Sequence, residues 1–131
     1  MSREALFPPG APKPRGPYSP AVIASGRLLF VSSQGPLDQA TRTFVEGPFE
    51  AVARQALTNL RSIVEASGGD LANAVKTTVF LADFDNFEAF NAVYAEFFPE
   101  PRPARTTVQS NLPFGCSVDV IVALDIDESA P

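Results

Sequence analysis

Apolar side chains recur at steps of three and four residues from Phe49 to Val64, and the charged residues of this stretch fall outside that stripe. A helix places residues with such spacings on one side, so the pattern predicts an amphipathic helix with one buried face. Gly68 and Gly69 follow directly, and glycine is the usual residue where a helix ends in the left-handed conformation. We therefore expect the helix to stop there.

A second helix is predicted from about Asp85 to Phe98, because Pro99 cannot continue it. The sequence DNFE at residues 85–88 is a variant of the capping box, with an acidic N-cap and a glutamate three positions on. The apolar stripe of this helix is aromatic except for Asn91. That amide is either an edge residue bonded to the backbone or a group that faces a polar pocket.

Runs of β-forming residues predict the strands. Two short runs on either side of Ser25 and Gly26 predict a hairpin, and further strands are expected over 74–82, 104–110 and 117–126. The order of elements is then ββαβαββ. It predicts an α+β fold in which two helices pack on one face of a mixed β-sheet.

Both faces of two predicted strands carry apolar residues. In the segment 117–126, valines occupy one face while Ile121 and Ala123 lie on the other, and the segment 74–82 shows the same habit. Two helices can cover only one face of a sheet, and a sheet face left to water would carry polar residues. We therefore expect a homo-oligomer, in which a partner chain buries the second face.

Length and composition predict one globular domain over residues 1–131, with a proline-rich irregular arm at residues 1–15. The segment 7–20 holds six prolines, which disfavour a regular helix. The 15 acidic and 10 basic residues give a net charge of −5, whereas nucleic-acid-binding proteins normally carry a basic stripe. The single cysteine, Cys116, cannot form an intrachain disulfide, and no segment is typical of a targeting or membrane-spanning sequence. We expect a cytoplasmic protein that binds neither nucleic acid nor a membrane.

In a chain without histidine, Arg105 is the strongest candidate for a binding group. The lack of histidine excludes Ser–His and Cys–His relays and histidine-based zinc sites. Pro103 stiffens the backbone before the predicted strand, and Thr106 and Thr107 add hydroxyls and backbone donors. Asp119 lies on the face that a partner chain is expected to cover, where a carboxylate needs a counterpart. Either Arg105 makes a salt bridge, or its planar guanidinium binds a small carboxylate ligand through two hydrogen bonds.

Several segments together resemble the Rid family, the reactive-intermediate deaminases, which are also called the YjgF family. The matching segments are GPYSPAV at 16–22, FVSSQGPLD at 30–38, the stretch from 59 to 98, and PARTTV at 103–108 followed by SVDVIVAL. The resemblance implies a fold like that of the small trimeric chorismate mutase. It also implies a homotrimer whose sheets line a central barrel, with clefts between the subunits.

Members of the deaminase branch hydrolyse 2-imino acids, or their enamine tautomers, to 2-keto acids and ammonia. By position, the resemblance makes Arg105 the group that binds the substrate carboxylate, beside the backbone N–H of Thr107. It assigns Tyr18, Ser32 and Asn91 to the substrate pocket, with Tyr18 and Ser32 contributed by the neighbouring subunit. The implied enzyme is a 2-iminobutanoate/2-iminopropanoate deaminase that uses neither a metal nor an organic cofactor.

Asp119 departs from the family pattern, because the deaminase branch carries a glutamate there that is thought to position the attacking water. Aspartate is one methylene shorter, which withdraws the carboxylate by roughly 1 Å, and such a misplacement can cost on the order of 10²-fold in rate. A positioned general base accelerates a reaction by about 10²- to 10⁴-fold. The shorter side chain therefore threatens most of the contribution expected from this second catalytic residue.

Three other functions remain open from the sequence. One is hydrolysis of a different small imine or amide with the same arginine clamp. Another is a non-catalytic trimer that binds small keto acids, which the change to Asp119 favours. The third is a ribonuclease or translation inhibitor, an activity also attributed to relatives, and the net charge of −5 and the lack of histidine count against it.

Overall fold

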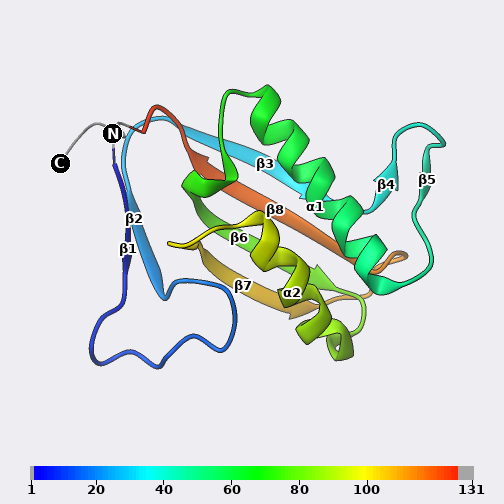
Figure 1. The fold of residues 1–131 in the computed structure, drawn as a ribbon, viewed down its shortest axis with the longest axis horizontal. Helices are drawn as coiled ribbons and strands as arrows, with labels where there is room; N and C mark the ends of the chain where they lie inside the picture. The colour runs from blue at the N-terminus through cyan, green and yellow to red at the C-terminus, as the bar shows by residue number, and fades with distance from the viewer. Residues whose placement is uncertain (1, 127–131) are drawn as a thin grey trace.

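A four-stranded mixed sheet forms the centre of the fold, in the order β3-β8-β6-β7 (Figure 1). Its strands are β3 (Leu28–Gln34), β8 (Cys116–Ala123), β6 (Ala74–Leu81) and β7 (Ala104–Gln109). Strands β6 and β7 are parallel, and the other two neighbouring pairs are antiparallel. The structure, a computed structural model, describes residues 2–126, so Met1 of the expected arm and residues 127–131 of the expected domain lie outside it.

Both helices lie on the same face of this sheet, as the sequence predicts (Figure 1). Helix α1 spans Phe49–Ala66 and helix α2 spans Phe87–Phe97. Their apolar stripes pack on the inward valines of β8 and β6, and these side chains form a continuous core. The predicted end of α1 is confirmed, because Gly68 has φ +87° and the N–H of Gly69 donates to the Val64 carbonyl at 2.9 Å.

Helix α2 begins differently from the predicted capping box. A short 3₁₀ turn, η2 (Phe84–Asn86), leads into the helix, and its N-cap is Asp83, whose side chain accepts from the N–H of Asp85 at 2.9 Å. Asn86, the residue before α2, makes no side-chain cap bond. The capping prediction at 85–88 is therefore wrong, since the 3₁₀ turn already provides the entry into the helix. Another 3₁₀ turn, η1 (Leu71–Asn73), is capped in the same way by an aspartate and joins α1 to β6.

The predicted hairpin around Gly26 is also wrong. Strand β2 (Ala21–Ala24) pairs antiparallel with β1 (Arg3–Leu6), not with β3. The guanidinium of Arg3 explains the difference, because its Nε donates to the Ala74 carbonyl at 2.6 Å and its Nη2 to the Pro101 carbonyl at 2.7 Å. These bonds dock β1 against the domain, so the expectation of an irregular arm over 1–15 fails at β1 and holds from residue 7 onward.

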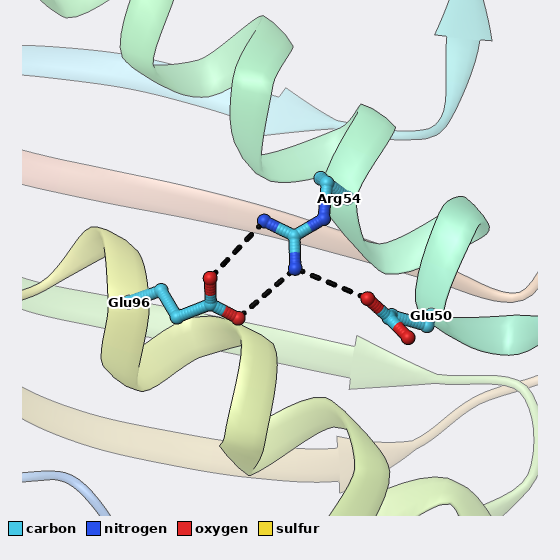
Figure 2. Close-up of polar contacts among 3 residues, drawn as sticks. All are labelled: Glu50, Arg54 and Glu96. Atoms are coloured by element: carbon cyan, nitrogen blue, oxygen red, sulfur yellow. Dashed lines mark hydrogen bonds and ion pairs between the residues drawn. The ribbon is translucent and has the colours of Figure 1, made fainter.

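The remaining elements lie at the edges. Strands β4 (Leu37–Asp38) and β5 (Thr43–Phe44) form a small hairpin between β3 and α1. On the outer side of the two helices, Arg54 of α1 contacts Glu50 at 3.2 Å and Glu96 of α2 at 2.9 Å (Figure 2). Such exposed pairs contribute little stability and mainly fix the orientation of the two helices. No helix in residues 2–126 is long and apolar enough to cross a membrane.

The sheet face opposite the helices carries large apolar side chains with nothing over them in the single chain. Phe30 of β3 is 68% exposed, Leu28 of the same strand 41% and Val108 of β7 37%. Burying such a surface stabilises an assembly by about 25 cal/mol per Å². This exposed face agrees with the expectation from the strand pattern that a partner chain covers it.

Candidate active site

Arg105 projects from β7 toward the helices. In the parallel pairing of β6 and β7 it lies beside Thr77, whose side chain is fully buried under α2. Because alternate residues of a strand face alternate sides, Thr107 shares the face of Arg105. The Nε of Arg105 donates to the Thr107 hydroxyl oxygen at 2.8 Å.

The guanidinium of Arg105 is enclosed by aromatic rings of α2. Its central carbon lies 4.6 Å from the ring centroid of Tyr94, 5.3 Å from Phe90 and 5.7 Å from Phe87. Both terminal nitrogens, Nη1 and Nη2, are buried and have no hydrogen-bond partner among residues 2–126. Burial lowers the pKa of Arg105, while the phenols of Tyr94 and Tyr18 act in the opposite direction. Since an arginine in a protein stays protonated, the site holds a buried cation that lacks an anion.

Asn91 and Tyr18 lie close to each other in the same chain. Asn91 of α2 is buried, and its Oδ1 has no hydrogen-bond partner. A Cβ built on Gly16 would lie 3.1 Å from Nδ2 of Asn91 and 3.6 Å from the Tyr18 ring, so the three residues are in close contact. Ser19 holds this segment in place, because its N–H donates to the Pro103 carbonyl at 2.9 Å.

The segment of Tyr18, which the resemblance assigns to the neighbouring subunit's side of the cleft, is docked on the strand of Arg105 in the same chain. This segment is tied to β7 of the same chain by a bridge between Ser19 and Ala104 and by a hydrogen bond from the Ser19 hydroxyl to the Arg102 carbonyl. No pattern in the sequence predicts this bridge, because it joins residues far apart in the chain. The single chain thus bonds Thr107 to Arg105 and packs Gly16 against both Tyr18 and Asn91.

Ser32 and Asp119 lie on the opposite face of the sheet. Asp119 pairs with Thr78, one residue beyond the Thr77 that lies beside Arg105, so its side chain projects away from the helices. Its Oδ1 accepts from the Thr78 N–H at 3.0 Å. Ser32 and Asp119 line one pocket of about 300 Å³ together with Lys76. Within a single chain, then, Arg105 and Asp119, the two predicted catalytic residues, lie on opposite faces of the sheet.

Sequence reasoning missed the residues that hold Arg105. The hydroxyls of Tyr94 and Thr77 are buried and form a hydrogen bond of 2.7 Å. Burial raises the pKa of Tyr94 to about 12, so its phenol stays neutral. Tyr94 was placed only in an aromatic core stripe, and its position one helical turn after Asn91 was the available signal that it faces the same site.

A larger pocket of about 500 Å³ lies on the outer side of Tyr18 and Gly16. Its walls come from the proline-rich segment, with Phe7 and Pro14, and from the loop of Pro101 and Arg102. Arg105 does not line it. Within residues 2–126, no group of three or more cysteine, aspartate or glutamate side chains is arranged to hold a metal ion.

Comparisons with known proteins agree with this architecture. The family model described as Endoribonuclease L-PSP matches residues 9–124. A RutC family protein of Pyrococcus horikoshii is 42% identical over 119 residues, which cover 90% of this chain and 94% of that protein. A protein of Dermatophagoides farinae named 2-iminobutanoate/2-iminopropanoate deaminase is also 42% identical over 119 residues, with 90% of this chain and 92% of that protein covered.

Solved structures show the same fold. A crystal structure of a putative endoribonuclease from Thermotoga maritima has a TM-score of 0.73 at 38% identity and covers 95% of this chain and 99% of that one. The crystal structure of RidA from Psychrobacter sp. PAMC 21119 has a TM-score of 0.71 at 34% identity, with 92% and 99% covered. The match to the family model spans most of the chain and agrees with the fold and the resemblance in the sequence. The chain belongs to the Endoribonuclease L-PSP family, that of the YjgF, RidA and RutC proteins.

Proposed function

We propose that this protein is a hydrolytic deaminase that converts small 2-imino acids, or their enamine tautomers, to 2-keto acids and ammonia. The observation that carries the proposal is the buried guanidinium of Arg105, whose Nη1 and Nη2 have no partner. A carboxylate accepts two parallel hydrogen bonds from such a pair of nitrogens. The relative from Dermatophagoides farinae that is named a deaminase supports this choice of substrate class.

The bound carboxylate fixes the position of the reacting carbon. With its carboxylate on Arg105, the substrate lies beside the amide of Asn91, whose Oδ1 is free to accept from an imine or enamine N–H. The ring of Tyr18, which contacts Gly16 next to Asn91, would border the bound substrate. Water then adds to C2 of the imine, the C2–N bond breaks, and ammonia leaves as the C2 oxygen becomes the keto group. Imines hydrolyse readily in water, so positioning alone gives a useful acceleration.

We further propose that copies of the chain complete the site between them, as a homotrimer. Strands β3 and β7 are the two edges of the four-stranded sheet. A head-to-tail ring, in which the open sheet face of one copy borders the β7 edge of the next, would bring Ser32 near Arg105. Because Asp119 lines the same pocket as Ser32, an interface that delivers one residue would deliver both. The carboxylate of Asp119 would then orient the attacking water.

The test is release of 2-keto acid and ammonia from 2-iminobutanoate and 2-iminopropanoate generated in situ, with semicarbazide to trap the residual imine. We expect the protein to accelerate hydrolysis and Arg105→Ala to abolish the effect. Arg27→Ala is the matched control, because Arg27 is exposed and pairs only with Asp125 at 2.6 Å. If Arg27→Ala loses as much activity as Arg105→Ala, the clamp is not at Arg105.

A second candidate function is non-catalytic binding of small keto acids. It is favoured by the position of Asp119, which lies on the sheet face away from Arg105 in the single chain. Asp119→Asn separates the two functions. In a deaminase it lowers kcat by about 10²-fold or more, the share of a positioned general base. If Asp119→Asn leaves the rate unchanged and the wild type binds 2-oxobutanoate without accelerating hydrolysis, the binding function is correct.

The word endoribonuclease in the family description raises a third function. The net charge of −5 and the lack of histidine give this chain neither an evident phosphate-binding surface nor the most common general base. RNA cleavage is therefore not part of the proposed function.

A further inference from the structure

Two of the contacts that hold the Arg105 side chain stand out. The Thr107 hydroxyl accepts the N–H of the guanidinium Nε at 2.8 Å, and the Tyr94 ring lies beneath the central carbon at 4.6 Å. The first contact fixes the direction in which the guanidinium points. The second supports it through a cation–π interaction, which is strongest where water is excluded. Only Nη1 and Nη2 remain without partners.

The Tyr94 ring is itself fixed in place. Its hydroxyl is hydrogen-bonded to Thr77 at 2.7 Å, and Thr77 is the residue of β6 that pairs with Arg105 of β7. The Tyr94 ring also stacks on the Phe98 ring, with 4.3 Å between the ring centroids, and its centroid lies 5.7 Å from that of Phe90. This buried hydrogen bond therefore connects α2 to β6, the strand that lies beside the one carrying Arg105.

We propose that the Thr107 hydroxyl and the Tyr94 ring are positioning residues that hold the Arg105 guanidinium ready for a carboxylate. The inference rests on the proposed function, because it concerns the same clamp. With Nε already bonded, the free edge of the guanidinium is the one formed by Nη1 and Nη2, which suits a bidentate carboxylate. A clamp that is ordered in advance loses less entropy when the substrate binds.

Thr107 offers the sharper experiment, because two substitutions differ only in the hydroxyl. Thr107→Val keeps the size and the branching but removes the acceptor, whereas Thr107→Ser keeps the acceptor. A hydrogen bond to a charged group predicts a loss of roughly 10- to 100-fold in the affinity for 2-oxobutanoate in Thr107→Val, and an equal rise in KM for the imine. We expect kcat to change by less than about 3-fold, because positioning the carboxylate affects binding of the substrate and the transition state alike. Thr107→Ser restores the wild-type affinity.

Tyr94→Phe tests the hydrogen bond to Thr77 that fixes the ring of the second contact. It keeps the ring and removes the hydroxyl that reaches Thr77, so a weaker effect is expected, about 3-fold in the same affinity. The NMR resonance of the Arg105 Nε–H group gives a readout that stability does not influence. We expect it to shift in Thr107→Val and to keep its wild-type position in Thr107→Ser. Thermal unfolding of each variant shows that the fold is retained.

The outcomes separate this inference from the proposed function. If the wild type binds 2-oxobutanoate but does not accelerate imine hydrolysis, the deaminase function fails and the inference is still decided by the affinities. If Thr107→Val binds as tightly as the wild type and leaves the Nε–H resonance in place, the inference is wrong and Thr107 has only a structural role. A wild type that binds no carboxylate at all would overturn both.

Discussion

At the scale of single residues, the site combines two buried polar groups that lack hydrogen-bond partners within residues 2–126. Arg105 is a buried cation without an anion, and Asn91 contributes a buried carbonyl oxygen without a donor. Each of these arrangements costs free energy in the empty protein, because polar groups lose their contact with water. A ligand with a carboxylate and an N–H group would satisfy both. A ligand that forms these missing hydrogen bonds would recover the free energy that the two residues cost, and this favours its binding.

The sequence identified Arg105 and Asn91 and assigned Asp119 to the sheet face away from the helices, but it could not place the segment of Tyr18. Arg105 stands out because of its position after Pro103, and Asn91 stands out as the one amide in an aromatic stripe. The position of the Tyr18 segment depends on the bridge between Ser19 and Ala104, which lie far apart in the chain. The pattern of neighbouring residues does not encode such a contact.

Two buried ionisable groups, the Cys116 thiol and the Tyr94 phenol, should make the free energy of unfolding depend on pH. Burial raises the pKa of the Cys116 thiol to about 12 and that of the Tyr94 phenol to about 12. Both groups must therefore lose a proton more easily in the unfolded chain, where a thiol titrates near 8.5 and a phenol near 10. Their stabilising effect is complete below these unfolded values and is lost as the pH rises toward 12. Each group then lowers the free energy of unfolding by at most about 1.4 kcal/mol per pH unit.

The measurement is urea unfolding between pH 7 and pH 11. We expect the free energy of unfolding of the wild type to fall from about pH 8.5 upward. Cys116→Ala should be less stable throughout, but its free energy of unfolding should stay constant until about pH 10, where the phenol begins to titrate in the unfolded chain. The native thiol should also be unreactive toward iodoacetamide at pH 8 and should react once the chain is unfolded. Equal slopes for both proteins between pH 8.5 and pH 10 would show that the thiol is not the group involved.

At the scale of elements, local signals predict the helices well and the pairing of the short strands poorly. The stripe and the glycine stop of α1 depend on residues close in sequence, and both are confirmed. The partner of β2 depends instead on Arg3, which bonds to carbonyls of Ala74 and Pro101 far along the chain. An arginine near the N-terminus gives no sequence pattern that announces such a contact.

The packing of α1 against the turn between β3 and β4 depends on the side chain of Asn59. Its Nδ2 donates to the carbonyls of Gly35 and Leu37 at 3.0 and 2.9 Å, and its Oδ1 accepts from Gln55 at 2.9 Å. The side chain is buried on the inner face of the helix. Replacing it removes the donors and leaves two backbone carbonyls with one partner fewer in a region shielded from water.

We expect Asn59→Ala to lower the free energy of unfolding by about 2 kcal/mol, the cost of leaving buried polar groups unsatisfied. Urea unfolding at pH 7 measures it, and Asn111→Ala, at an exposed position, is the control and should change stability by less than about 0.5 kcal/mol. Hydrogen exchange should report faster opening at β4 than at β8. A loss below 0.5 kcal/mol for Asn59→Ala would mean that water replaces all three bonds.

At the scale of the whole molecule, the two faces of the sheet carry the two halves of the predicted site. The helix-covered face holds Arg105 with its aromatic surroundings, and the open face holds Asp119 and Ser32 among exposed apolar side chains. No movement of side chains brings the two halves together, because the sheet itself lies between them. Association of chains is the simplest arrangement that uses both, and it also removes the open apolar face from water.

Phe30→Glu tests whether the site is shared between chains. Phe30 is 68% exposed on the open face, and a charge there is incompatible with a buried interface. We expect the wild type to sediment as a trimer, three times 14.0 kDa, and Phe30→Glu to sediment as a folded monomer with little or no deaminase activity. Ile63→Glu, at a partly exposed apolar position on α1, is the matched control and should stay trimeric and active. A folded, monomeric Phe30→Glu that keeps wild-type kcat/KM would show that one chain contains a complete site, and Ser32 and Asp119 would then have no part in the reaction.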